Sequence, residues 1–354
     1  MKLLIAAGGT GGHIFPGISV AEALTSSGTG EVFFAGTPYG LEEKLIPQNG
    51  YRLAKIEAKP FLGASVRAKA ATLLAVVRGT LQARRLIKAE KPDAILGMGG
   101  FTSVPVVLAG LFLRVPCFLH EQNIAPGLAN RLLAGRVKAV FVSFAESARF
   151  FSAKQVIHTG NPIRKTMRGN RDAKRGGAFT VFIFGGSRGA GSVNSAALEM
   201  LPYLEAHNHT AIYHQTGRDD YARVSASYHS TSVPSEVFPF TDHMERYYNR
   251  ADVVVSRSGA STIFELSYFR KPAVLIPYPF AAGGHQWKNA SYVERLGGGC
   301  VIANSDVSGE KLYRVLTGLR ENAEELRRMG ERIGTIYVED AEDKVIRGIE
   351  ARVP

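Results

Sequence analysis

A chain of 354 residues that is 45% hydrophobic and 21% charged is long enough to bury two cores of ordinary domain size. Its formal net charge of +12 predicts an acidic partner: a phosphate group, an anionic lipid surface or nucleic acid. Two distant cysteines exclude a disulfide framework and a zinc site. The chain also lacks an apolar leader and any apolar run of roughly 18 residues, so we expect a cytoplasmic protein without a membrane span.

The first half of the sequence alternates short apolar runs with helical patterns, which is typical of a parallel sheet covered by helices. The expected strands are Lys2–Ala7, Val32–Ala35, Arg52–Ile56, Ala94–Leu96, Cys117–Leu119 and Ala139–Val142. The helical patterns between them cover Pro16–Leu24, Arg67–Lys88, Val104–Leu113 and Gly127–Leu133.

Residues 165–177 are polar and basic and have no apolar period, which predicts a linker. The strand pattern then restarts, with expected strands at Phe179–Phe184, Ala211–His214, Val253–Ser256, Ala273–Ile276 and Cys300–Ile302. We therefore predict an α/β protein with two doubly wound, Rossmann-like domains over residues 1–164 and 165–340. Residues 341–354 form an amphipathic pattern that predicts a terminal helix packing back on the first domain.

Three of the expected strands run directly into glycine clusters, at residues 8–12, 97–100 and 185–190. Ligands of doubly wound folds bind at the carboxyl ends of the strands, where glycine lets backbone amides approach a phosphate. A tight turn would explain one cluster, but three at equivalent positions predict a ligand site. Ile14 and Arg188 stand where a dinucleotide fingerprint needs glycine, and no Gly-Lys-Ser/Thr sequence is present, so NAD and ATP are disfavoured.

Several short motifs, in order along the chain, resemble those of the MurG family of glycosyltransferases. They are Gly8–Pro16, His120–Asn123, Gly160–Arg164, Gly185–Ala190, Ser256–Ala260 with Glu265, and His285–Gln286 with Asn289–Ala290. Each motif is weak alone, but the ordered set is specific and extends over residues 1 to about 300. That family adds N-acetylglucosamine (GlcNAc) to lipid I to make lipid II, for the peptidoglycan on which bacterial cell shape and division depend.

The resemblance implies a GT-B fold, in which two Rossmann-like domains flank a cleft. UDP-GlcNAc would lie mainly on the second domain and lipid I on the first, and transfer to the muramyl 4-hydroxyl would invert the anomeric carbon. The enzyme would be a peripheral protein at the cytoplasmic face of the bacterial cell membrane.

No D-x-D sequence is present to hold a metal on the donor diphosphate, so no cofactor is expected. The sequence leaves open whether a divalent ion stimulates activity. Arg164 and the amides around Ser187 are suited to neutralise the leaving group. Taken alone, Arg164 would be interpreted as a solvated linker residue.

The resemblance also implies the other contacts to UDP-GlcNAc. Glu265 would accept both ribose hydroxyls, although a carboxylate in a first helical turn also compensates the helix dipole. Thr241 would contact uracil through its backbone, and Gln286 would donate to and accept from sugar hydroxyls. Asn123 would face the same sugar, unless it only caps a helix. The remaining expected contacts are Thr10, Gly11, Gly12, Ala260, Ser261, Thr262 and His285.

In the first domain, the expected contacts to the acceptor pyrophosphate are Gly9, Gly99 and Gly100. His13 is the candidate general base, because imidazole titrates near neutral pH, although it could serve only to bond a phosphate. Glu121 is the alternative base. His120 and His158 follow apolar strands and are expected to be structural.

Residues 59–88 contain seven Lys or Arg residues and no Asp or Glu. Apolar residues recur within this stretch at every fourth position, which predicts an amphipathic helix on an anionic bilayer. The expected membrane face consists of Arg67, Leu73, Val77, Arg78, Leu81, Arg84 and Arg85. Alternatively, the apolar stripe packs on the sheet and the cations are merely solvated.

Two rival functions remain open at this point. Another GT-B enzyme, such as a glycolipid synthase or a UDP-GlcNAc 2-epimerase, would share the fold. A basic nucleic-acid-binding protein would share the charge, but no RRM, KH or helix-turn-helix signature is present, and aromatic residues do not interleave with the basic run. We therefore expect UDP-GlcNAc, lipid I and an anionic membrane as partners, and no nucleic acid.

Overall fold

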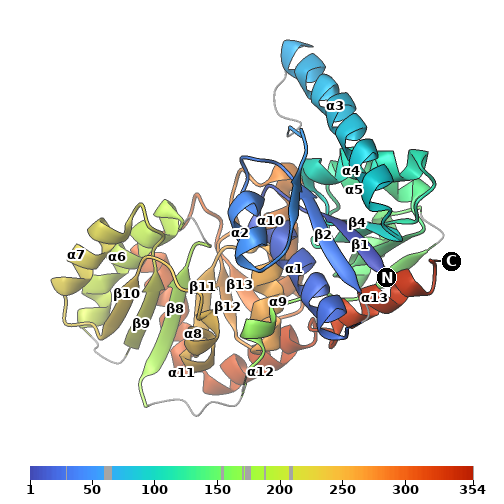
Figure 1. Cartoon of the computed structure of the whole chain (residues 1–354). Coiled ribbons are helices and arrows are strands. Elements are labelled where there is room, and N and C mark those ends of the chain that lie inside the picture. Colours follow the sequence, from blue (N-terminus) through green and yellow to red (C-terminus); the bar gives the residue numbers. More distant parts are fainter. Residues whose placement is uncertain are drawn as a thin grey trace. The chain divides into compact units, whose positions relative to one another are not determined.

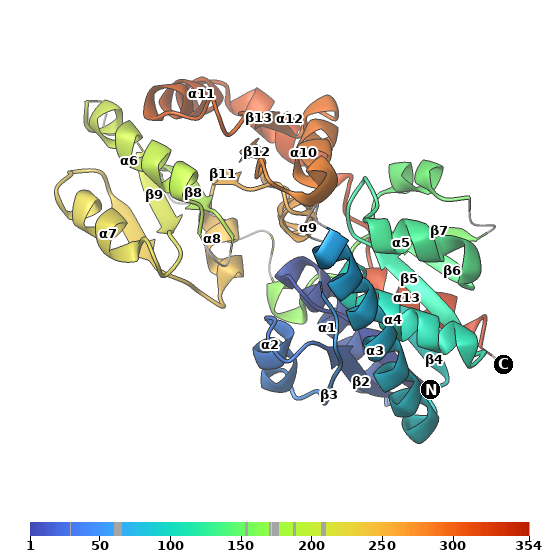
Figure 2. The same cartoon turned by 90° about the horizontal axis from the view of Figure 1, so that it is seen from above.

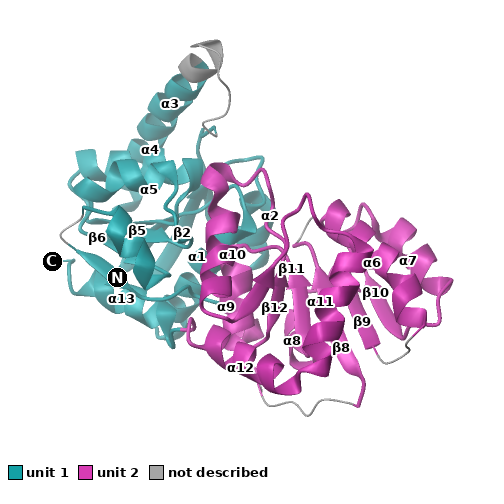
Figure 3. Cartoon of the chain, turned by 180° about the vertical axis from the view of Figure 1, so that it is seen from behind, with its two compact units in different colours: residues 1–164, 338–354 teal, residues 165–337 magenta. Residues whose placement is uncertain are grey.

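The computed structural model describes residues 1–28, 30–59, 66–152, 155–169, 171, 177–186, 189–206 and 210–353, without the side chains of residues 66–70. The chain divides into two compact units, one of residues 1–164 and 338–354 and the other of residues 165–337 (Figure 3). The first crossing lies directly after Arg164, and the chain returns to the first unit at Val338 rather than at Ala341.

A seven-stranded parallel sheet forms the centre of the first unit, in the order β3-β2-β1-β4-β5-β6-β7 (Figure 1). Its strands are β1 (Lys2–Ala6), β2 (Glu31–Gly36), β3 (Leu53–Lys55), β4 (Ala94–Gly97), β5 (Cys117–Glu121), β6 (Ala139–Val142) and β7 (Val156–His158). The chain order reverses between β1 and β4, whose last residues Ala6 and Gly97 are register partners. This reversal is the place where doubly wound sheets bind ligands.

Helices cover both faces of this sheet. Those of the first unit are α1 (Gly11–Ser26), α2 (Glu42–Gln48), α3 (Val66–Glu90), α4 (Gly100–Phe112), α5 (Leu128–Leu133) and α13 (Ala341–Glu350). One buried cluster joins Ile18 of α1 to Val345 and Ile349 of α13, so the terminal helix packs on the first unit. A second cluster on the opposite face joins Ala83 of α3 to Val107 of α4.

The second unit contains a six-stranded parallel sheet in the order β10-β9-β8-β11-β12-β13. Its strands are β8 (Phe179–Phe184), β9 (Thr210–Gln215), β10 (Ser235–Phe238), β11 (Val253–Ser256), β12 (Ala273–Leu275) and β13 (Gly299–Val301). Here the reversal lies between β8 and β11, whose ends Phe184 and Ser256 are register partners. Its helices are α6 (Gly191–Glu205), α7 (Tyr221–His229), α8 (Met244–Arg250), α9 (Ala260–Tyr268), α10 (His285–Arg295), α11 (Gly309–Glu321) and α12 (Ala323–Gly334).

The helices that follow glycine loops begin earlier than their apolar patterns predict. α1 starts at Gly11 rather than Pro16, and α4 starts at Gly100 rather than Val104. Their first turns carry glycine and polar residues, so no apolar period marks them, although Thr102 and Ser103 are fully buried. The helix α2 was not expected, because its seven residues are too few to show a helical period. The bounds of β7 and β10 were not predicted in full, although one strand was expected just before His158 and another to end at Phe238–Phe240.

Candidate functional site

The first glycine loop connects β1 to α1 and is held in place by Glu42 of α2. Glu42 is fully buried, and its carboxylate accepts hydrogen bonds from the Gly9 amide at 3.0 Å and from the Thr37 amide and hydroxyl at 3.0 and 2.6 Å. A side chain on Gly8 would lie 2.6 Å from this carboxylate. Glu42 engages the Gly9 amide, and the expected contact of Gly9 with the acceptor pyrophosphate stays a prediction. The loop also offers the Gly11 and Gly12 amides, which precede the first helical hydrogen bond of α1.

The second glycine loop, after β4, lies against His13. Gly99 and Gly100 have φ values of +88° and +72°, which side-chain-bearing residues rarely adopt. A Cβ atom on either glycine would be 3.3 Å from the His13 ring. Glycine is therefore required at both positions so that the backbone can approach the imidazole. The structure thus brings His13, Gly99 and Gly100 together at the reversal between β1 and β4.

His13 is partly exposed, and its Nδ1 atom lies 2.9 Å from Oε1 of Gln122. Loss of solvent lowers the pKa of the His13 imidazole below its usual range, while Gln122 and the Met98 carbonyl act in the opposite direction. The ring is therefore neutral at physiological pH, as a general base must be.

Glu121, the alternative base, has both carboxylate oxygens engaged. Oε1 accepts from the backbone and side-chain amides of Asn123, and Oε2 accepts from the Gly127 amide and from Nδ2 of Asn130, at distances from 2.9 to 3.4 Å. Burial raises the pKa of the Glu121 carboxyl, and these four bonds oppose that change. Such a contact set holds the turn after β5 in shape, so it favours His13 over Glu121 as the base. The expected sugar contact by Asn123 stays a prediction.

Arg164, the last residue before the chain enters the second unit, lies beside the first glycine loop. Its guanidinium stacks over the Phe15 ring, 4.6 Å from the centroid, and that ring is 3.0 Å from the position of a Cβ on Gly11. The stacking places a permanent cation close to the N-terminus of α1, where an anion would bind.

In the second unit, Arg257 follows β11 at the reversal of the sheet. Its guanidinium donates to Asn304 Oδ1 at 2.8 Å, Ser192 Oγ at 3.0 Å, and the carbonyls of Ile276 and Pro277 at 3.0 and 3.2 Å. No carboxylate partners it in the part of the chain that the structure describes, so its charge is available to an anionic ligand. Burial lowers the pKa of Arg257, which stays charged. No role was predicted for Arg257, although it lies within the Ser256–Ala260 motif, because its partners Asn304 and Ser192 are distant in the sequence. Ser187 lies outside the described residues.

The N-terminus of α9 supplies three consecutive amides. The first helical hydrogen bond runs from Ile263 to Gly259, so the amides of Ala260, Ser261 and Thr262 precede it. The Ser261 hydroxyl is buried and has no hydrogen-bond partner among the described residues. One turn later, Glu265 Oε2 accepts from the hydroxyl of the buried Tyr248 at 2.9 Å, which fixes the orientation of the carboxylate.

The remaining donor candidates are oriented through backbone contacts. The Thr241 amide donates to Gln215 Oε1 at 3.1 Å. His285 Nδ1 lies 2.8 Å from the Ala282 carbonyl. Gln286 Oε1 accepts from the Tyr278 amide at 2.9 Å, which orients the side chain and leaves one lone pair and the NH₂ group for a ligand. The expected role of Gln286 as donor to and acceptor from sugar hydroxyls stays a prediction.

α3 carries an apolar stripe that does not pack on the sheet. The small residues Ala75, Gly79 and Ala83 form its buried side, and a Cβ on Gly79 would lie 2.0 Å from a backbone oxygen. Figures 1 and 2 show α3 lying over α4 and extending beyond it. The helices α3, α4 and α5 carry exposed apolar side chains: Leu73, Leu74, Val77, Leu81, Phe112, Leu128 and Leu132. Arg78, Arg84 and Arg85 are exposed on the same helix; the Arg67 side chain lies outside the described residues.

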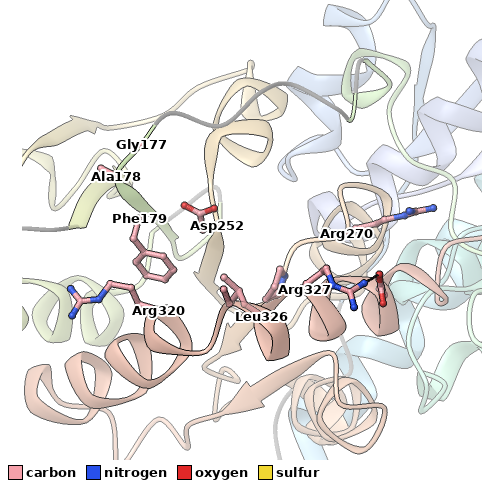
Figure 4. A pocket seen from close by; sticks show the side chains of 12 residues that line it. Gly177, Ala178, Phe179, Asp252, Arg270, Arg320, Leu326 and Arg327 are labelled. Carbon is pink, nitrogen blue, oxygen red and sulfur yellow. Dashed lines mark hydrogen bonds and ion pairs between the residues drawn. The ribbon is translucent and has the colours of Figure 1, made fainter.

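A cavity of about 530 Å³ lies at the opposite end of the second sheet, where β8, β11 and β12 begin. Phe179 and Leu326 lie in its middle, and Arg320 and Arg270 lie on opposite sides (Figure 4). Doubly wound folds bind ligands at the carboxyl ends of their strands, so this cavity is not part of the candidate site. Within the described residues, no helix has the length and apolar character that a membrane crossing needs.

Comparisons with known proteins show the family of the chain. The chain matches the glycosyltransferase family 28 N-terminal domain over residues 3–142 and the family 28 C-terminal domain over residues 180–345. It is 41% identical over 351 residues to the UDP-N-acetylglucosamine–N-acetylmuramyl-(pentapeptide) pyrophosphoryl-undecaprenol N-acetylglucosamine transferase of Geobacter sp. strain M21, covering 98% of this chain and 95% of that protein.

Two solved structures are also similar to this chain, one of a MurG protein and one that shares only the fold. The crystal structure of Acinetobacter baumannii MurG matches with a TM-score of 0.80 and 28% identity over 99% of both chains. A UDP-GlcNAc 2-epimerase from Neisseria meningitidis matches with a TM-score of 0.69 over 99% of this chain and all of that one, but at 14% identity it shows the fold alone. Fold and site thus define a glycosyltransferase with the GT-B architecture. The chain belongs to glycosyltransferase family 28 and, within it, to the MurG family.

Proposed function

We propose that this chain transfers GlcNAc from UDP-GlcNAc to the 4-hydroxyl of the muramyl group of lipid I, forming lipid II. The observation that carries the proposal is the position of His13, a neutral imidazole between two glycine loops at the sheet reversal. The relationship to the transferase of Geobacter supports the choice of donor and acceptor.

The reaction is an inverting displacement. The oxygen of the acceptor hydroxyl forms a bond to the anomeric carbon while the bond from that carbon to UDP breaks. His13 takes the hydroxyl proton, and the diphosphate leaves with its negative charge. Within the second unit, the α9 amides and Arg257 are the groups we assign to this charge, and no resident metal is included.

We also propose that the exposed apolar and basic face of α3–α5 rests on an anionic bilayer at the cytoplasmic side of the cell membrane. The acceptor carries a polyprenyl chain that stays in the bilayer, so the enzyme has to work at its surface. Apolar side chains flanked by arginines suit that position. Nucleic acid is not a partner in this proposal.

The direct test incubates the protein with sugar-labelled UDP-GlcNAc and lipid I, with and without a chelator. A labelled lipid product in both samples is expected. Loss of product with the chelator would refute the metal-free mechanism. Formation of UDP-N-acetylmannosamine without a labelled lipid would establish the epimerase instead, and salt-sensitive RNA binding without UDP-GlcNAc binding would favour the nucleic-acid protein.

A further inference from the structure

Polar groups of the first unit form an unbroken chain of hydrogen bonds that ends on His13. His120 Nε2 lies 3.3 Å from the Gly160 carbonyl, and His120 Nδ1 lies 3.0 Å from Gln122 Nε2. Gln122 Oε1 in turn lies 2.9 Å from His13 Nδ1. His120 and Gln122 are 0% and 1% exposed, so water does not compete for these bonds.

The backbone carbonyls of Met98 and Gly160 determine which atom donates in each of these hydrogen bonds. The Met98 carbonyl lies 3.0 Å from one terminal atom of Gln122 and can only accept, so that atom is the nitrogen and the oxygen faces His13. The Gly160 carbonyl likewise requires a proton on His120 Nε2, which leaves His120 Nδ1 to accept from Gln122. An amide oxygen can only accept, so His13 carries its proton on Nδ1.

We propose that Gln122 and His120 are positioning residues that hold His13 in the tautomer with its proton on Nδ1 and its lone pair on Nε2. The Nε2 side of the ring borders the Gly100 backbone, where a Cβ would lie 3.5 Å from it. A neutral imidazole with an unconstrained Nδ1 could place its proton on either nitrogen, and a proton on Nε2 would prevent that atom from acting as a base. The inference rests on the proposed role of His13 as the base.

The hydrogen bonds from His120 through Gln122 also stabilise the His13 ring after it has taken a proton. When Nε2 takes the proton of the acceptor hydroxyl, the ring becomes a cation whose Nδ1–H still donates to Gln122 Oε1. His120 is the titratable neighbour that interacts electrostatically with His13, and burial lowers its pKa to about 4, so it stays neutral. Glu42 and Glu121, on the neighbouring elements α2 and β5, direct their carboxylates to Gly9 and to the turn after β5.

The tautomer can be measured directly in the unmodified protein. Long-range ¹H–¹⁵N NMR of the ¹⁵N-histidine-labelled chain at pH 8 distinguishes a protonated Nδ1 from a protonated Nε2, with His13→Ala for assignment. A protonated Nδ1 is expected. A protonated Nε2 would overturn the inference whatever His13 does. A protonated Nδ1 together with full turnover in His13→Ala would refute His13 as the base and leave the tautomer assignment standing.

Kinetics test the positioning role. Gln122→Met keeps the length of the side chain and removes its hydrogen bonds to His13, His120 and the Met98 carbonyl, so kcat should fall roughly 10²-fold with the Michaelis constants for UDP-GlcNAc and lipid I nearly unchanged. Its NMR spectrum should show His13 no longer confined to the Nδ1-protonated form. His158→Gln is the matched control and should keep wild-type turnover. His158 is bonded to the Ser143 carbonyl and takes no part in the hydrogen bonds that lead to His13. Wild-type kcat in folded Gln122→Met would overturn the inference.

Discussion

Glu42 accepts a hydrogen bond of 3.0 Å from the backbone amide of Gly9, which places a buried carboxylate against the first glycine loop. Its other donors, the amide and hydroxyl of Thr37, leave it with three hydrogen bonds. We expect Glu42→Gln to lower the free energy of unfolding by about 1–3 kcal/mol, because an NH₂ group would face a donor at one of these positions. Urea denaturation followed by circular dichroism measures the change.

The neighbouring residue provides the control for that substitution. Glu43 forms an exposed ion pair with Lys55 at 2.8 Å, so Glu43→Gln should cost no more than about 1 kcal/mol. Equal losses in the two variants would show that the carboxylate beneath the loop has no special role. We also expect Glu42→Gln to raise the Michaelis constant for lipid I, since the loop it shapes belongs to the acceptor site.

Arg257 should contribute strongly to donor binding. Its four hydrogen-bond acceptors hold the guanidinium at the sheet reversal with no carboxylate beside it among the described residues. Arg257→Gln should weaken UDP binding, measured by calorimetry, by about 1.5–3 kcal/mol, because a charge-assisted contact is lost. The exposed Arg250 at the end of α8 serves as the control, and Arg250→Gln should bind UDP as the wild type does. Unchanged affinity in Arg257→Gln would remove Arg257 from the site.

Membrane binding should depend on the arginines of α3. Replacing Arg78, Arg84 and Arg85 with Gln should weaken sedimentation with anionic liposomes by roughly 100-fold at low salt, since each cation near such a surface contributes about 1 kcal/mol. High salt should release the wild type as well.

A second triple variant with the same change in net charge shows whether liposome binding depends on the arginines of α3 or on the net charge of the protein. Arg314, Arg327 and Arg328 lie in the second unit and are paired with glutamates on their own helices, so their replacement by Gln should leave liposome binding nearly intact. If both triple variants lose binding equally, the attraction is due to net charge, and α3 is not the membrane face.

Much of this fold follows from the sequence because its strands are buried on both faces. Lys2–Ala6 and Phe179–Phe184 are almost wholly apolar and are followed within two residues by glycine, so their positions and the glycine loops at their carboxyl ends were predictable. The helix α2 was not, because its seven residues are too few to show a helical period.

The residues of the candidate site could be predicted only where they belong to a short motif in the sequence. His13 stands out among glycines, and the structure places its ring against Gly99 and Gly100, while its role as the base stays a prediction. Glu42 could not be found, because a glutamate in the first turn of a helix ordinarily compensates the helix dipole. The structural role of Glu42 depends on its hydrogen bond with the amide of Gly9, which lies 33 residues away in the sequence. The directions of the Gln122 amide and the His120 ring likewise depend on the carbonyls of Met98 and Gly160, which only the folded sheet brings near them.

His214 should make the second unit sensitive to acid. It is fully buried between Asn194 and Tyr228, and burial lowers its pKa to about 3, against about 6.5 in the unfolded chain. Between these two values the unfolded state binds more protons, so stability falls as the pH drops from about 6.5 toward 3. At pH 5 the loss from this group should reach about 2 kcal/mol.

The chain's single tryptophan, Trp287, lies in the second unit and reports its unfolding by fluorescence. Urea titrations at pH 7.5 and 5.0 should show a smaller difference for His214→Gln than for the wild type. The exposed His229 provides the comparison, and His229→Gln should retain the wild-type difference. An identical pH dependence in all three proteins would assign the acid sensitivity to other groups.

The pH dependence of turnover should report the His13 imidazole. Because desolvation lowers its pKa, the ring stays neutral to a lower pH than a solvated histidine does, and the neutral ring is the active base. The rising limb of kcat/KM should therefore lie below about pH 6.5. Lowering the pH through that limb protonates the ring and removes activity.

Replacing Gln122, the hydrogen-bond partner of His13, with an acidic residue should shift the rising limb of kcat/KM to higher pH. Gln122→Glu places a carboxylate next to Nδ1, which favours the imidazolium and should shift the limb upward by about 1–3 pH units. His13→Ala should remove the limb and lower kcat by roughly 10²–10⁴-fold, because the proton of the acceptor hydroxyl then has no base to receive it. UDP-GlcNAc binding by His13→Ala should be retained, since we assign the donor contacts chiefly to the second unit. A limb that stays at the same pH in Gln122→Glu would belong to a group that does not touch Gln122. If it also survives in His13→Ala, that group, and not His13, is the base.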